Sequence, residues 1–186
     1  MRNKSSHPSE QIPQIVPLVR RPRNLKQKGE LAELAFLHKA ASLGFGVAKP
    51  YGDSESYDFI LDSGERFWRV QVKSIHTRSQ WVYRTQAQHG NGRRYKPKDI
   101  DFLVAYVVQR DIWYVIPVTC VATAALSFYP SGCKKNAGQF ECYREAWHLM
   151  APGGDLKPLP LTVRRIRAIA PHRKYFIEAG FAKVRI

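Results

Sequence analysis

YDFILDSGERFWRVQVKS, at residues 57–74, predicts a β-hairpin around which we expect the rest of the chain to be organised. Both halves are rich in the aromatic and β-branched residues that favour strands, and the Asp-Ser-Gly-Glu link between them has the composition of a turn. Side chains alternate across a strand, so the second half places Trp68, Val70 and Val72 on an apolar face. Gln71 and Lys73 lie on the opposite face, where core packing does not explain an amide beside an ammonium.

The length and composition suit one domain with extensions. Of the 186 residues, 44% are hydrophobic, which is enough for a sizeable core and argues against global disorder. No apolar run approaches the length of a membrane span, and the polar, proline-broken start lacks the apolar segment of a secretory signal. The three cysteines are odd in number and have no C-x-x-C spacing, so we expect reduced thiols. These features predict a cytoplasmic protein with no membrane partner.

The net charge of +15 is concentrated at the two ends of the chain. Residues 1–28 hold seven Lys and Arg against one acid, and residues 151–186 hold eight against two. The segment 29–150 has a net charge of only +3. Basic ends on a nearly balanced core favour binding along a phosphate backbone, because each neutralised phosphate releases condensed counterions. Solubility alone, or association with RNA or the ribosome, are the alternative explanations of this charge.

A helix is expected near the start of the ordered part of the chain, from Leu25 to Leu43. Asn24 is suited to cap its N-terminus and Gly44 to end it. Its apolar residues extend most of the way around the helix, so we expect it to be covered on more than one side.

The remaining elements follow from apolar runs and turn residues. Further strands are expected at 45–48, 75–85, 101–108 and 112–118, the last two forming a second, mostly buried hairpin. Short helices are expected at 119–126 and 143–149. Composition then divides the chain into a basic, proline-containing arm at 1–24, a domain at 25–150, and a basic C-terminal extension at 151–186.

A glycine-containing loop between the hairpins is basic and carries aromatic residues. From Arg78 to Lys98 there are six Lys and Arg and no acid, interleaved with Trp81, Tyr83 and Tyr95. This combination favours phosphate contact with some stacking, although a solvated basic loop would have the same composition. The nucleic-acid-binding candidates are Arg78, Arg84, Arg93, Arg94, Lys96 and Lys98, with Arg164, Arg165 and Arg167 in the C-terminal extension.

The polar residues of the core elements form a candidate metal-dependent site. Glu33 lies on the predicted helix, Asp58 at the entry to the first hairpin strand, and Gln71 and Lys73 on the second. Carboxylates and amide carbonyls are the oxygen ligands that Mg²⁺ prefers. A lysine beside such an ion can orient or deprotonate the attacking water, or offset charge in the transition state of a phosphodiester. The four residues therefore favour hydrolysis of a phosphodiester.

Each of these residues also has a purely structural interpretation. Asp58 and Lys73 can form an ion pair at the strand edge, and Glu33 can pair with Lys28 or Lys39 on the helix surface. Gln71 can be an inward amide whose hydrogen bonds are made with the backbone. A structural role for all four at once is much harder to sustain, given their order and the basic surroundings.

Glu33, Asp58 and the Gln71-Val72-Lys73 triplet, in the order helix, strand, strand, resemble the motif of the PD-(D/E)XK nuclease superfamily. The Lys28-Gly29 pair and the Gly44-Phe45 helix exit are similar to archaeal Holliday-junction resolvases. The Gln-x-Lys form more closely resembles a bacterial PD-(D/E)XK endonuclease family that includes an intron-encoded homing endonuclease. The blocks that support it downstream are Asp99-Ile100-Asp101-Phe102, Trp113-Tyr114-Val115-Ile116-Pro117 and Tyr143-Arg144-Glu145-Ala146-Trp147. The resemblance covers about residues 26–150.

This resemblance implies an α/β, restriction-endonuclease-like core of the order αβββαβ, with a central mixed sheet flanked by helices. It implies a Mg²⁺-dependent DNA endonuclease, with Mn²⁺ able to substitute, whose metal ligands are Asp58, Gln71 and Glu33. Lys73 would activate water or stabilise charge. Tyr57 stands where the motif has proline, and Gln71 replaces its second acid, which leaves the site one negative charge short. The alternative is therefore a catalytically inactive nucleic-acid-binding protein on a nuclease fold. Cutting both strands would favour a homo-oligomer.

Overall fold

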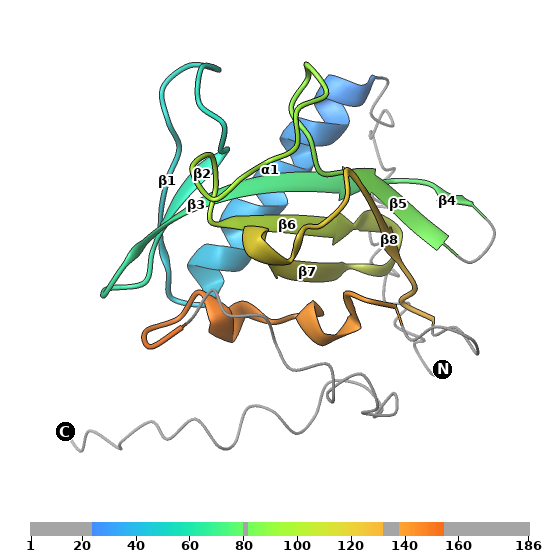
Figure 1. Cartoon of the computed structure of the whole chain (residues 1–186). Helices are drawn as coiled ribbons and strands as arrows, with labels where there is room; N and C mark the ends of the chain where they lie inside the picture. The colour runs from blue at the N-terminus through green and yellow to red at the C-terminus, as the bar shows by residue number, and fades with distance from the viewer. Residues whose placement is uncertain (1–23, 80–81, 132–137, 155–186) are drawn as a thin grey trace, which may run out of the picture.

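The computed structural model describes residues 24–79, 82–131 and 138–154. Five strands form the main sheet in the order β1-β2-β3-β6-β7 (Figure 1). They are β1 (Gly46–Ala48), β2 (Phe59–Asp62), β3 (Phe67–Ile75), β6 (Phe102–Val107) and β7 (Ile112–Pro117). The predicted basic arm, Trp81, Cys133 and the C-terminal Arg164, Arg165 and Arg167 lie outside the described residues.

The first predicted hairpin is confirmed as β2 and β3. Strand β3 lies at the centre of the main sheet and is the longest strand that the structure describes. Phe59 of β2 pairs with Val70 of β3 in an antiparallel register. On its other side, β3 pairs in parallel with β6, and β6 pairs antiparallel with β7 as the second predicted hairpin. The sheet is therefore mixed, with one parallel pair at its centre, and the predicted α/β fold class is confirmed.

A small second sheet contains two strands from the crossover between β3 and β6. It consists of β4 (Arg78–Ser79), β5 (Val82–Gln86) and β8 (Ala125–Phe128), with β5 in the middle. The expected order αβββαβ has a helix in this crossover. In the described part of the crossover, β4, β5 and a long loop stand in that place.

The helix predicted at 119–126 is wrong. A 3-10 turn at Val118–Cys120 is followed by β8, whose Leu126 and Phe128 are fully or almost fully buried. Because Leu126 and Phe128 are two residues apart, a strand turns both toward the core, where Phe128 lies opposite Tyr83 of β5. Tertiary pairing thus overrides the helix preference of the alanines in this segment.

The helix predicted at 143–149 is also wrong. Two 3-10 segments, Glu141–Tyr143 and Trp147–Leu149, flank Glu145, whose φ is +50°. That left-handed conformation interrupts a right-handed helix. It lets the Glu145 amide donate to the Trp113 carbonyl at 2.8 Å, which ties the segment to β7.

The predicted first helix is confirmed as α1 (Leu25–Ser42). The Asn24 side chain accepts a hydrogen bond from the Gln27 amide at 2.8 Å, as an N-cap does. Three residues at spacings of four, Ala32, Phe36 and Ala40, bury one stripe of the helix.

The expectation that α1 is covered on more than one side is wrong for the described residues. Leu31, Leu34 and Leu37 keep 48%, 62% and 41% of their surface exposed. Hydrophobic residues around the whole circumference do not by themselves show burial, because a folded surface always retains apolar side chains.

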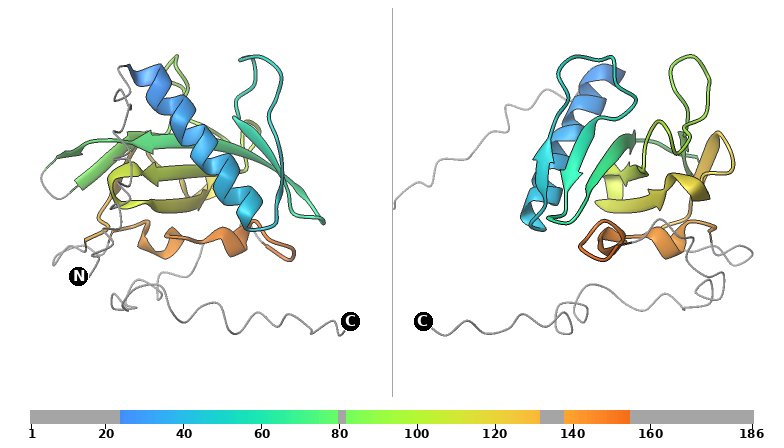
Figure 2. Two further views of the ribbon diagram at one scale, coloured as in Figure 1. Left: turned by 180° about the vertical axis from the view of Figure 1, so that it is seen from behind. Right: turned by 60° about the vertical axis from the view of Figure 1, so that its left-hand side comes forward.

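Helix α1 crosses one face of the main sheet, as the rear view in Figure 2 shows. The Phe36 ring lies 5.0 Å from that of Phe59, which is opposite Val70 in the register. Paired residues point to the same side, so α1 covers the face that carries Val70. Alternation then places Gln71 and Lys73 on the other face, toward the small sheet and the loop that leads to β6.

Within the part of the chain that the structure describes, no helix is long and apolar enough to cross a membrane. Of the cysteines, Cys120 and Cys142 are free thiols, as predicted.

Candidate active site

Asp58 lies directly before β2 and bonds to β3 through both its backbone and its side chain. Its amide donates to the Val70 carbonyl at 2.9 Å, which extends the antiparallel ladder by one bond. Its Oδ2 then accepts from the Val72 amide at 2.7 Å and from Gln71 Nε2 at 2.6 Å. Both bonds engage the same oxygen, so Oδ1 has no hydrogen-bond donor among the described residues and is available to a ligand.

The Asp58 carboxylate is held in an unfavourable electrostatic setting. Burial raises its pKa from 3.8 to about 6, and the nearby negative charge of Glu33 acts in the same direction. The Val72 amide, the positive charge of Lys73 and the Gln71 amide oppose the rise without cancelling it. An ionised carboxylate that is partly removed from water binds a cation more favourably than a solvated one, because the cation supplies the positive charge that the surrounding protein does not.

Gln71 is buried, with 8% of its surface exposed, and its amide is oriented by the protein. Nε2 donates to Asp58 and, at 3.3 Å, to the Val72 carbonyl. Both partners are acceptors, so the amide nitrogen occupies this position and the side-chain oxygen is directed away from them. Gln71 therefore positions Asp58 while its own oxygen has no donor among the described residues.

Lys73 is half-buried on the same face of β3 as Gln71. Burial lowers the pKa of its ammonium, and the negative charge of Asp58 partly opposes this. The alternative structural interpretation, an ion pair between Asp58 and Lys73, is not found: among the described residues, no carboxylate lies within 4.0 Å of the Lys73 ammonium. Its Nζ instead lies over the ring of Tyr95, 5.4 Å from the centroid.

Glu33 reaches the site from α1, on the opposite side of the sheet. It does not pair with Lys28 or Lys39; its Oε2 accepts from Lys49 Nζ at 2.7 Å. Lys39 lies 3.7 Å from Glu145 instead. The negative charge of Glu33 raises the pKa of Asp58, and Lys49 lies close enough to both carboxylates for their charges to raise its own pKa.

Asp58, Gln71 and Lys73 lie on one face because Asp58 follows the register of β2 opposite β3 and is bonded to Gln71. On β3 beyond Val70, the Val72 amide is not paired with the backbone of β2 and donates to the Asp58 side chain. Glu33 approaches from the face that α1 covers, and Gln71 and Lys73 from the other.

Two further residues contribute to the site and were not predicted as members of it. Lys49 follows β1, and Tyr95 lies on the loop between β5 and β6, where it was predicted only as an aromatic residue of a basic loop. Burial raises the pKa of Tyr95 to about 12, and the charges of Asp58 and Asp99 add to this, so its hydroxyl stays protonated. Neither residue is marked by a motif or spacing, since each reaches the site only through the tertiary fold.

An ion pair between Arg69 of β3 and Asp101 attaches the end of the loop that carries Tyr95. Arg69 donates to both carboxylate oxygens of Asp101, at 2.9 and 3.1 Å from NH2 and Nε. Its Nη1 donates to the Lys98 carbonyl at 2.6 Å, and Nη2 donates to the Pro97 carbonyl at 2.7 Å as well as to Asp101. A bidentate guanidinium pair of this kind is geometrically specific, so the end of the loop is placed firmly beside the site.

The donor atoms suit a hard divalent cation that keeps much of its water. No group of three or more His, Cys, Asp or Glu in the described residues is arranged to hold a metal ion. Asp58 Oδ1 and the Gln71 side-chain oxygen are nevertheless open, and Mg²⁺ in proteins is commonly bound through one or two carboxylates with several waters retained. Asp58 and Gln71 therefore fit such an ion, whereas Glu33 is engaged by Lys49.

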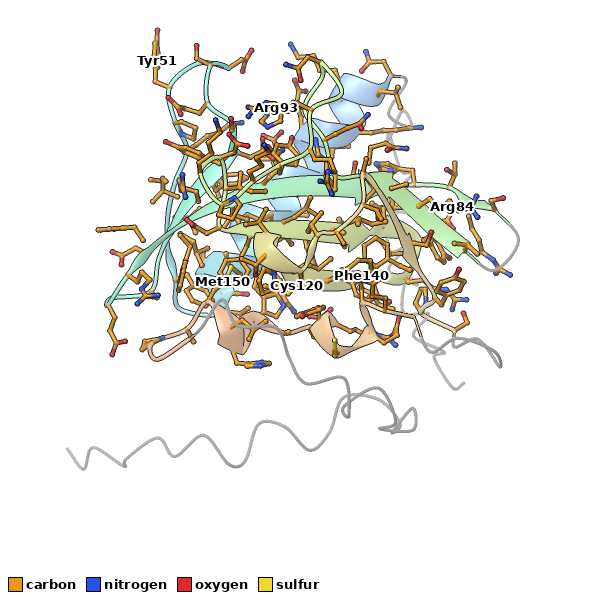
Figure 3. All side chains as sticks on the ribbon, viewed as in Figure 1. Tyr51, Arg84, Arg93, Cys120, Phe140 and Met150 are labelled. Carbon is orange, nitrogen blue, oxygen red and sulfur yellow. The ribbon has the colours of Figure 1, made fainter. Side chains whose placement is uncertain are left out.

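The predicted nucleic-acid-binding residues are divided between two places. Figure 3 shows Arg93 at the loop before β6 and Arg84 on the small sheet. Arg84, Lys96 and Lys98 are exposed. Arg93 contacts Asp99 at 3.3 Å, and an Arg94 nitrogen donates to the Ala122 carbonyl, so both guanidinium groups also have internal partners. Arg78, in the short strand β4, is exposed as well.

Comparison with known proteins finds a family model and solved structures that this chain resembles. The family model described as PD-(D/E)XK endonuclease matches residues 23–150. The solved structure of a bacterial homing endonuclease, I-Ssp6803I, is 32% identical, covers 70% of this chain and 94% of that one, and has a TM-score of 0.62. The Holliday junction resolvase Hjc of Archaeoglobus fulgidus matches at 17% identity over 56% and 85% of the two chains, with a TM-score of 0.36. No curated protein matches.

Proposed function

The chain belongs to the PD-(D/E)XK endonuclease family, and from this we propose that it is a Mg²⁺-dependent endonuclease that hydrolyses phosphodiester bonds in DNA. One observation carries the proposal. A half-buried carboxylate with a raised pKa, Asp58, lies beside β3 with a buried amide and a half-buried lysine next to it. Ionising Asp58 at this position is unfavourable for the fold, so the arrangement favours a functional role over a structural one.

Each residue of the site would have a distinct part in the reaction. A bound Mg²⁺ would supply Lewis-acid stabilisation of the phosphodiester and lower the pKa of bound water. Asp58 would hold the ion through Oδ1, and Gln71 would keep that carboxylate oriented while offering its own oxygen. Lys73 would orient the attacking water or stabilise the charge that develops on the phosphate. Glu33 would act from the opposite face, through water.

The exposed basic residues supply the contact with the DNA backbone in this proposal. Lys96 and Lys98 belong to the loop that carries Tyr95, close to the site, whereas Arg84 extends the basic surface along the small sheet. Contacts of this kind position a duplex without reading its sequence. The basic ends of the chain would add affinity of the same kind.

The proposal is tested by cleavage of supercoiled plasmid and of four-way-junction DNA with Mg²⁺, with Mn²⁺ and with a chelator. We expect cleavage by the wild-type protein with either metal and none with the chelator. Lys73→Ala should lower the rate by a factor on the order of 100 or more, since it removes a group acting directly on the transition state. Lys26→Ala, on the exposed first turn of α1, is the matched control and should cleave like the wild type. Unchanged cleavage by Lys73→Ala would refute the assigned mechanism.

The second candidate function is nucleic-acid binding without cleavage, and Gln71 is the observation that favours it. An amide in place of the second acid leaves the site with less negative charge for a metal. This alternative predicts salt-dependent binding with no metal-dependent cutting under any condition, so cleavage of any DNA by pure protein would exclude it. Competition between duplex DNA and RNA for the protein would then separate DNA binding from association with RNA.

We also propose that residues 25–150 form the catalytic domain, flanked by a basic arm at 1–24 and an extension at 151–186. One chain carries one such site, so cutting both strands of a duplex favours a homo-oligomer. Sedimentation of the protein with and without DNA would test this, and a monomer that cuts both strands would contradict it.

A further inference from the structure

Tyr95 places an aromatic ring against the ammonium of Lys73. The Lys73 Nζ lies 5.4 Å from the ring centroid, and only 6% of the Tyr95 surface is exposed. The face of an aromatic ring carries partial negative charge that attracts a cation, and the attraction is stronger where water is excluded. We propose that Tyr95 is a positioning residue that holds the Lys73 ammonium in its working position. This inference rests on the proposed nuclease activity.

Lys73 needs such a contact because little else orients it. Its four-carbon stem is flexible, and an ammonium has no preferred plane or fork through which its partner could fix it. Within the described residues, Lys73 forms no ion pair within 4.0 Å, and the attraction of Asp58 acts at longer range. The ring of Tyr95 is therefore the contact that determines where the ammonium lies before substrate arrives.

The Tyr95 ring is itself held by its own loop. On one side it contacts the His89 ring, with centroids 4.2 Å apart. His89 Nε2 lies 3.5 Å from the buried carboxylate of Asp99, which also accepts from Arg93 at 3.3 Å and from the Lys96 amide at 3.0 Å. Three parts of the loop thus converge on one carboxylate, and this restricts the position of the ring.

This arrangement joins substrate contact to the placement of the catalytic lysine. Arg93 and Lys96, two of the residues proposed to contact phosphate, belong to the same folded loop as Tyr95. A loop that contacts the DNA backbone also carries the surface on which Lys73 rests. Tyr95 itself is buried and contacts Lys73, so we expect it to affect the rate of the chemical step and not the affinity for DNA.

Substitution of Tyr95 separates these effects. Tyr95→Phe keeps the ring and should retain the single-turnover rate to within about twofold. Tyr95→Leu removes the ring and should lower that rate about tenfold, with the Kd for DNA unchanged, because a desolvated cation–π contact has about this strength. Tyr83→Leu is the control for lost packing: Tyr83 is equally buried, on β5, and its substitution should lower thermal stability without this loss of rate.

Two measurements exclude a merely structural role. Phenylalanine analogues with increasing ring fluorination at position 95 keep the shape of the ring but weaken its negative face, so the rate should fall stepwise. In NMR spectra, the ε-methylene protons of Lys73 should be shifted upfield by the ring current, and Tyr95→Leu should abolish that shift.

The outcomes distinguish failure of this inference from failure of the proposed function. If the wild-type protein cleaves no DNA, the proposed function fails, and the ring-current shift still decides whether the contact exists. Equal rates across the fluorinated series, an equal loss in Tyr95→Phe and Tyr95→Leu, or absence of the ring-current shift would each overturn the role of Tyr95.

Discussion

Asp58 is a carboxylate whose burial makes its ionisation unfavourable in the folded protein. Its pKa is raised to about 6 in the folded chain from an unfolded value near 3.8, so the folded state binds its proton more tightly. The stability that this group contributes is fully present below pH 3.8 and is lost as the pH rises through 6. At neutral pH the ionised Asp58 therefore destabilises the metal-free protein.

We expect Asp58→Asn to stabilise the metal-free protein at pH 7 by about 1–3 kcal/mol, because each pKa unit corresponds to about 1.4 kcal/mol. The asparagine oxygen can accept the same two hydrogen bonds from Val72 and Gln71. Urea unfolding across pH 3.5 to 8 would show the gain growing between the two pKa values, while cleavage is lost. Asp53→Asn, in the exposed loop after β1, is the control. A stabilisation that does not depend on pH would contradict the explanation.

Gln71 is the position at which the second acid of the family motif is replaced, and its bond to Asp58 predicts what restoring an acid would do. Gln71→Glu places two carboxylates in contact, since Nε2 now lies 2.6 Å from Asp58 Oδ2. We expect the metal-free variant to be destabilised by about 1–3 kcal/mol at pH 7, through the lost hydrogen bond to a charged group. Mg²⁺ should bind about tenfold more tightly, because ligand charge raises affinity.

Calorimetric titration with Mg²⁺ and melting curves with and without the ion would measure both effects of Gln71→Glu. Gln71→Met, of similar size and without a charge or donor, should be destabilised without gaining affinity. If Gln71→Glu bound Mg²⁺ no better than the wild type, Gln71 would not belong to the metal site.

At the scale of the elements, α1 brings Glu33 to the site through one buried aromatic residue. Phe36 contacts the rings of Phe59, Trp113 and Trp147, with centroids 5.0, 6.2 and 6.0 Å away. These rings belong to β2, β7 and the closing 3-10 segment, so one side chain attaches the helix to three other elements.

Phe36→Ala should accordingly lower the free energy of unfolding by about 3–5 kcal/mol, as for other buried aromatic residues replaced by alanine. Leu34→Ala, on the same helix and 62% exposed, should change it by less than about 0.5 kcal/mol. Urea unfolding of the two variants at one pH would compare them directly. A similar loss in both would mean that a further surface covers Leu34.

At the scale of the whole molecule, the excess positive charge lies mostly outside the segment that matches the family. Residues 1–23 and 155–186 carry thirteen Lys and Arg against three acids. The family match and the site both fall between them. The basic ends are therefore expected to contribute to DNA affinity and not to the stability of the domain.

A fragment of residues 24–154 should retain the melting temperature of the full chain to within a few degrees. Its affinity for duplex DNA should decrease less steeply as salt is added, because fewer counterions are released on binding. Fluorescence anisotropy at several salt concentrations would give both slopes. An unchanged slope would show that the ends do not contact DNA, and failure to fold would refute the proposed domain boundaries.

The family resemblance and most of the elements were predictable because they depend on local information. Alternation along β3 separates Val70 and Val72 from Gln71 and Lys73 whatever packs against the strand, and Asn24 caps its helix by a bond to a residue three positions away. The failures were at 119–126 and 143–149, where pairing with β5 and the left-handed Glu145 override local preference.

The sequence by itself determined the hairpin, the first helix and the residues of the motif, since periodicity and turn chemistry act between near neighbours. Only the tertiary structure decided how those residues are used: that Glu33 pairs with Lys49, that Gln71 donates to Asp58, and that Lys73 lies over Tyr95. These contacts join residues distant in the chain, and the strength of each depends on how much water the fold excludes. The spacing of residues along a sequence shows neither which distant residues meet nor how much water is excluded around them.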